Sequence, residues 1–161
     1  MNDDLIINSL EFATQKHSVT LNFQGADLAE LLDSIVDQPG QITATVVGNT
    51  RRDGKPYLDL SIVGVLALEC QRCLETLNYE INSRSRFIIA PTENDLTDIS
   101  EESDNTSSIL AEREFDLRGF AQGETLLALP MSPKHEAGFC VRPDSTLSDD
   151  DVTNPFWALK R

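Results

Sequence analysis

A Cys-x-x-Cys pair lies between two stretches of alternating apolar and polar residues, and this arrangement constrains the fold more than any other feature. Residues 58–68 precede Cys70 and Cys73, and residues 77–89 follow them. Alternation with a period of two is typical of a half-buried strand. The pattern therefore predicts two strands joined by a turn that holds both cysteines. It does not predict the strand-to-helix unit that carries a thioredoxin-like motif.

Two further strands are predicted upstream of this pair. Residues 17–24 alternate loosely between apolar and polar side chains, and residues 42–47 are rich in Thr, Val and Ile. Asp53-Gly54 lies in a polar break before the long strand, which is a hairpin signal. Together the strands predict an antiparallel β-meander.

Two main helices are predicted to pack on this sheet. Apolar residues at helical spacing cover residues 28–36, behind Asp27 as the expected N-cap. Asp116 is the expected N-cap of a second helix over residues 117–128. The predicted fold class is α+β, with a single domain over the whole chain, residues 1–161.

Two segments lack this periodicity. Residues 91–110 contain no Lys or Arg and are rich in Ser, Thr and Asn. Their acidic residues are Glu93, Asp95, Asp98, Glu101, Glu102 and Asp104. This composition predicts a mobile acidic loop. Residues 144–161, which include three consecutive aspartates, predict a partly flexible C-terminal tail.

The charge balance restricts the classes of partner. The chain has 27 acidic and 13 basic residues, which gives a formal net charge of -14. A broad acidic surface repels nucleic-acid phosphate and anionic lipid, because affinity for both depends on clustered Lys and Arg. We therefore expect a basic protein partner, and RNA contact only through a local basic patch.

The sequence gives no sign of export or of membrane insertion. Residues 1–5 have neither the basic region nor the apolar core of a secretory signal. No apolar run approaches the roughly 18 residues that a membrane span needs. We expect a cytoplasmic protein, in which an odd number of cysteines favours metal binding or redox chemistry over a disulfide framework.

Four residues have the chemistry of a zinc site. Cys70 and Cys73 are expected at a tight turn, and His135 and Cys140 follow in a segment broken by Pro and Gly. Three thiolates and one imidazole are a permitted tetrahedral zinc set, and a closed four-ligand site is structural. Two alternatives stay open: reduced, partly buried cysteines beside a surface histidine, and a redox-active thiol pair.

Basic and aromatic residues supply further binding candidates. Arg51, Arg52 and Lys55 cluster at the predicted hairpin tip, and Arg72 lies in the cysteine turn. They form either a basic spot that touches RNA phosphate or ordinary solvated charges. Two aromatic residues, Phe156 and Trp157, lie in the tail and are expected to dock on the domain or on a partner.

No arrangement of residues indicates catalysis. The chain has no Gly-rich phosphate loop, no G-x-S-x-G and no H-E-x-x-H motif. We therefore expect a protein that binds and is not an enzyme.

Three blocks of sequence, in order, carry a family resemblance. They are LECQRC at residues 68–73, ETLLALP at 124–130 with Pro133, His135 and Cys140, and NPFWALKR at 154–161. They resemble the signatures of the YceD family, the large ribosomal RNA subunit accumulation proteins. The resemblance implies a non-enzymatic bacterial or plastid protein that is needed for normal accumulation of large-subunit ribosomal RNA.

Two functional hypotheses follow. The first is a ribosome-biogenesis accessory protein that binds a basic ribosomal protein or a pre-ribosomal particle. The alternative is a zinc- or thiol-dependent regulator or oxidoreductase that uses the Cys-x-x-Cys pair.

Overall fold

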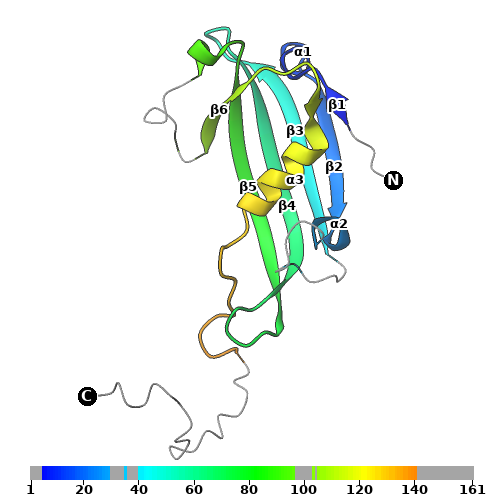
Figure 1. Cartoon of the computed structure of the whole chain (residues 1–161), viewed down its shortest axis with the longest axis vertical. Helices are drawn as coiled ribbons and strands as arrows, with labels where there is room; N and C mark the ends of the chain where they lie inside the picture. Colours follow the sequence, from blue (N-terminus) through cyan, green and yellow to red (C-terminus); the bar gives the residue numbers. More distant parts are fainter. Residues whose placement is uncertain (1–4, 30–34, 36–39, 97–102, 104, 141–161) are drawn as a thin grey trace, which may run out of the picture.

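Five strands form one sheet in the order β2-β3-β4-β5-β6 (Figure 1). The computed structural model of the chain describes residues 5–29, 35, 40–96, 103 and 105–140. The strands are β2 Ser18–Gln24, β3 Gln41–Thr50, β4 Pro56–Glu69, β5 Thr76–Ala90 and β6 Thr106–Leu110. Strands β2 to β5 pair antiparallel, and β6 pairs parallel to β5. The prediction of an α+β fold with an antiparallel meander is confirmed.

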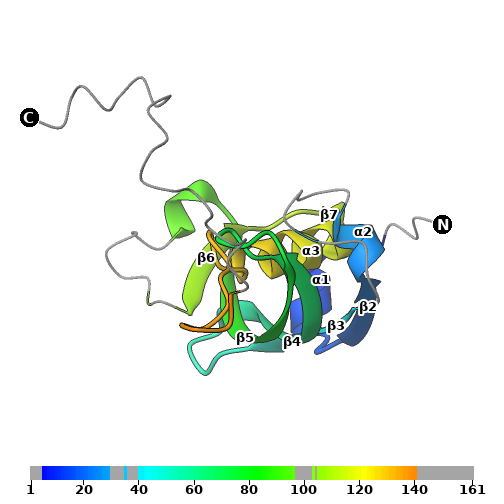
Figure 2. The same cartoon turned by 90° about the horizontal axis from the view of Figure 1, so that it is seen from below.

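Short helices cover one face of this sheet. They are α1 Ser9–Thr14, α2 Gly25–Ala29 and α3 Leu117–Leu127. Figure 2 shows the sheet curving around α3, with α1 on the same side. A small second sheet pairs β1 Ile6–Ile7 with β7 Phe115–Asp116. No described helix covers the other face of the large sheet, and most side chains on that face are at least partly exposed.

The core lies between the sheet and α1 and α3. Leu58, Leu60 and Ile62 of β4 point toward the helices and are at most 2% exposed. Phe120 of α3 packs edge-on against Phe87 of β5, with ring centroids 4.8 Å apart. Burial of alternate residues of each strand is the main favourable contribution to stability here.

The helix predicted over residues 28–36 is wrong in its start and at Ile35, and residues 30–34 and 36 lie outside the described residues. Helix α2 begins at Gly25, and Asp27 lies inside it, where its carboxylate accepts a hydrogen bond from the Gln24 N–H at 2.9 Å. Ile35 forms an isolated antiparallel bridge with Leu68. This bridge forms because β3 pairs with β4 only as far as Val65, which leaves the last residues of β4 without a neighbour on that side.

The acidic loop predicted over residues 91–110 is too long. Residues 106–110 form β6, and a short 3-10 turn, η1, spans Glu93–Asp95. Strand β6 has little apolar alternation of its own, so its local sequence does not predict a strand. Its parallel ladder with β5 stabilises it. All four acidic residues between η1 and β6 lie outside the described residues: Asp98, Glu101, Glu102 and Asp104.

Gly48 of β3 gives a direct test of how α1 packs on the sheet. A Cβ atom at Gly48 would lie 2.5 Å from the Phe12 carbonyl oxygen and 2.7 Å from the Ala13 Cα. We expect Gly48→Ala to lower the free energy of unfolding by about 1–3 kcal/mol, the usual cost of overpacking. Denaturant unfolding measures this change.

Gly123 of α3 is the matched control. A Cβ atom there meets nothing within 4 Å. Since Ala is a better helix former, Gly123→Ala should raise the free energy of unfolding by about 0.4–1 kcal/mol. Equal destabilisation by both substitutions would contradict this packing of α1.

Candidate metal centre

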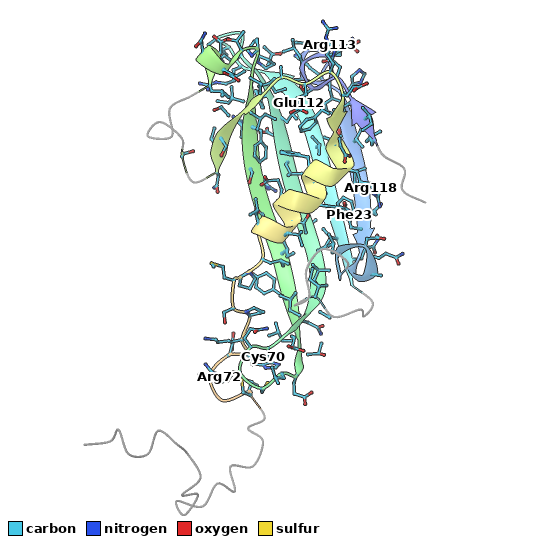
Figure 3. All side chains as sticks on the ribbon, viewed as in Figure 1. Phe23, Cys70, Arg72, Glu112, Arg113 and Arg118 are labelled. Carbon is cyan, nitrogen blue, oxygen red and sulfur yellow. The ribbon has the colours of Figure 1, made fainter. Side chains whose placement is uncertain are left out.

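The β4–β5 hairpin ends in the turn that holds the two cysteines. Pairing continues to Glu69↔Thr76, so residues 70–75 make the connection. The Cys70 N–H donates to the Glu75 carbonyl, and the Leu74 N–H donates to the Cys70 carbonyl, both at 2.9 Å. Leu74 adopts a left-handed conformation with φ 61°. Figure 3 shows Cys70 at this end of the molecule, far from α1.

A second segment reaches the same turn after α3. The Gln71 N–H donates to the Pro133 carbonyl at 2.8 Å and so joins the two segments. This contact places His135 and Cys140 beside the cysteine turn. The Cys70 and Cys140 sulfurs are then 3.7 Å apart, and the Cys73 sulfur lies 3.3 Å from His135 Nδ1.

The four predicted ligands form one cluster. The three sulfurs and one imidazole nitrogen all lie within 4.8 Å of one another. Cys70 is buried, and the other three residues are half-buried. Ligands of a tetrahedral ion are separated by distances of this order, so the cluster can hold a metal ion. A donor set rich in thiolate selects soft ions over Mg²⁺ or Ca²⁺.

A hydrogen bond sets the orientation of His135. Its Nε2 lies 3.3 Å from the Thr76 carbonyl oxygen. Because a carbonyl oxygen only accepts, Nε2 carries the proton, and the lone pair of Nδ1 faces Cys73 and Cys140. Metal-binding histidines usually donate their other N–H to such an acceptor.

The thiols of Cys70 and Cys140 differ in pKa. Burial raises the pKa of the Cys70 thiol, but hydrogen bonds from the backbone of Cys73, His135 and Arg72 outweigh it, and the pKa falls to about 5. Burial and the neighbouring thiols of Cys70 and Cys73 raise the pKa of Cys140. A divalent cation would relieve this repulsion, because thiolates are the form that binds a metal.

The basic residues predicted for binding do not form one patch. Arg51, Arg52 and Lys55 lie at the turn between β3 and β4, and Arg72 lies beyond the other end of β4. That strand has 14 residues, so roughly 45 Å of strand separates them at about 3.3 Å per residue. Arg51 lies 3.6 Å from Asp53 in an exposed ion pair. The tail aromatics Phe156 and Trp157 lie outside the described residues.

Sequence reasoning did not identify the residues that support the cluster. Thr76 and Pro133 contribute only backbone carbonyls, which leave no signal in side-chain type. The proline marks a break in regular structure, but only the fold shows that its carbonyl meets Gln71.

A cluster of soft donors that could hold a metal ion therefore lies at the tip of a long hairpin, on an α+β sheet. Within the part of the chain that is described, no helix is long and apolar enough to cross a membrane.

The chain belongs to the YceD family, described as Large ribosomal RNA subunit accumulation protein YceD, which it matches over residues 58–160. Membership implies a role in the accumulation of large-subunit ribosomal RNA. No curated protein and no solved structure matches the chain.

The metal centre is tested by equilibrium dialysis against Zn²⁺ and Mg²⁺. We expect one Zn²⁺ ion per chain, no retained Mg²⁺, and a higher thermal unfolding midpoint in the loaded protein, since an ion that binds only the folded state stabilises it. His135→Ala should lower the affinity by more than tenfold, because it removes a ligand and the loss of an outer-shell partner alone costs about 10–100-fold.

His17→Ala is the control for that experiment. His17 is exposed, and its Nε2 contacts the Gln15 side chain at 2.7 Å, far from the cluster in the sequence. Its loss should leave binding unchanged. Retention of Zn²⁺ by the His135 variant at full affinity would show that the cluster is not the binding site.

Proposed function

We propose that this protein is a non-enzymatic accessory factor of large-subunit ribosome assembly. It supports the synthesis, processing or accumulation of large-subunit ribosomal RNA by binding a basic ribosomal protein or an assembly intermediate. The observation that carries this proposal is the family match over residues 58–160, which includes β4, β5, α3 and all four residues of the cluster.

The acidic surface supports a basic protein as the partner. Only two ion pairs join described residues, Arg51–Asp53 and Arg86–Asp59. Exposed carboxylates such as Glu80, Glu112 and Glu114 therefore have no cationic partner within the described part of the chain. Unpaired charges of one sign accelerate encounter with a partner of the opposite sign.

Zinc is the ion that we propose for the cluster. The donor set of three sulfurs and one nitrogen fits Zn²⁺, and four protein ligands leave no open position for a substrate. The ion would hold the segment after α3 against the hairpin turn. A reducing cytoplasm fits three cysteines that form no disulfide.

The alternative of a thiol oxidoreductase has less support. Cys70 has the acidic thiol that such an enzyme needs, but its side chain is buried and cannot meet a second substrate. The cysteine pair also precedes a strand, not a helix. Turnover of a disulfide substrate by the purified protein would favour this alternative.

Depletion in cells tests the proposed function. We expect large-subunit ribosomal RNA to fall relative to small-subunit RNA, and a wild-type copy to restore it. A Cys70→Ser copy should restore it only in part, because the variant loses a buried metal ligand. Quantified ribosomal RNA and subunit profiles provide the measurement. An unchanged ratio after depletion would contradict the function.

The same cells test the class of partner. Capture of the protein at low and moderate salt, after RNase treatment, should retain basic large-subunit ribosomal proteins, with recovery falling as salt rises. A His17→Ala protein should recover the same set. Loss of every ribosomal protein after RNase treatment would show that RNA, and not a protein, mediates the association.

A further inference from the structure

The open face of the sheet contains a hollow that is separate from the metal centre. Its volume is about 520 Å³, and it lies over β3, β4 and β5, with the start of β6 at its side. Its polar lining includes Thr45, Ser61, Arg84, Arg86 and Asn105. A hollow of this size lies within the usual range of about 300–1,000 Å³ for ligand sites.

The register of the sheet sets a polar row across this hollow. Thr45 of β3 is opposite Ser61 of β4, and Ser61 is opposite Arg84 of β5. Side chains directly opposite one another in antiparallel strands lie about 4.5–5.5 Å apart at Cβ. Two hydroxyl groups and one guanidinium therefore face the same space on a rigid support.

The guanidinium of Arg86 is already paired with the carboxylate of Asp59. It donates to both carboxylate oxygens of Asp59, at 2.7 and 2.9 Å, and its guanidinium stacks over the Tyr57 ring at 4.3 Å. The bond to Asp59 raises the pKa of Arg86, so its charge is permanent. This pair neutralises Asp59, the one acidic residue among the described residues that line the hollow.

Arg84 is free to take an anion. Within the described part of the chain it forms no ion pair, and it is exposed on the same face as Arg86. With Asp59 compensated by Arg86, the described lining of the hollow carries one unbalanced positive charge on a chain of net charge -14. Such a local cation attracts an anionic group that the rest of the surface repels.

We propose that this hollow binds a ribose-phosphate unit of single-stranded RNA, with Arg84 on the phosphate and the hydroxyls of Ser61 and Thr45 on the ribose. The planar guanidinium fork suits phosphate oxygens. Hydroxyl groups donate and accept, as the ribose 2′-OH does. The site goes beyond the proposed binding of a basic protein and does not depend on it.

A single strand fits the hollow better than a duplex does. Duplex recognition needs contacts to phosphates spread across a wide groove, and the net charge of -14 on the chain opposes so long a footprint. A single strand can place one or two phosphates at Arg84 and keep the remainder in solvent. The contact is therefore local, weak and sensitive to salt.

Binding of a short RNA to the purified full-length protein tests the site. The probe is a fluorescent oligouridylate of about six nucleotides, within the usual site size for single strands. Fluorescence anisotropy at low salt gives the affinity. We expect Arg84→Glu to weaken binding by about tenfold or more, the usual loss for a charge-assisted hydrogen bond. The salt slope should fall by about 0.7 for each phosphate contact that is lost.

Arg113→Glu is the matched control. Arg113 is exposed on the connection between β6 and β7, away from the open face, and the substitution changes the net charge by the same amount (Figure 3). The affinity of the Arg113→Glu protein for the oligouridylate should stay within about threefold of wild type, since only long-range charge changes. If Arg84→Glu has a lower unfolding midpoint than the wild-type protein, Arg84→Gln is tested in its place, because it adds no acidic group.

Three results would overturn the proposal. The wild-type protein fails to bind the oligomer, Arg113→Glu weakens binding as much as Arg84→Glu does, or uridine monophosphate binds as tightly as the oligomer. The last result would identify a small-molecule site. Because the assay contains no ribosomal protein, its failure leaves the proposed assembly function to be judged on the depletion experiment.

Discussion

The antiparallel pairing of β4 with β5 fixes which side chains face the core and where the cysteine turn lies. The ladder runs without interruption from Tyr57↔Ile88 to Glu69↔Thr76. A slip of one residue would turn the buried side chains of β4 outward and separate Arg84 from Ser61. The same register therefore holds the core on one face, the polar row on the other and the cysteine turn at the end.

The cysteine turn extends this constraint to the C-terminal part of the chain. Helix α3 ends at Leu127, and the residues after it are joined to the turn by the contact of Gln71 with Pro133 and by the cluster. Few apolar groups are buried there, since Met131 and Phe139 are exposed. A metal ion would supply the stability that a hydrophobic core supplies elsewhere.

The strands and the cluster could be predicted because their signals lie in residue type and spacing. Alternation over β4 and β5 is strong, and Asp116 caps α3 as predicted, accepting from the Gly119 N–H at 3.0 Å. Helix α1 was not predicted, since six residues are too few to show a period. Strand β6 and the bridge at Ile35 depend on neighbours distant in sequence, which no local pattern reveals.

Four residues from two distant segments lie together, and we propose that they form one closed metal site. X-ray absorption spectroscopy at the zinc edge of the loaded protein tests it most directly. We expect three sulfur ligands at about 2.3 Å and one nitrogen ligand at about 2.0–2.1 Å. A coordination shell with only two sulfurs and added oxygen ligands would contradict it, because His135 and Cys140 would then not join the cysteine turn around one ion.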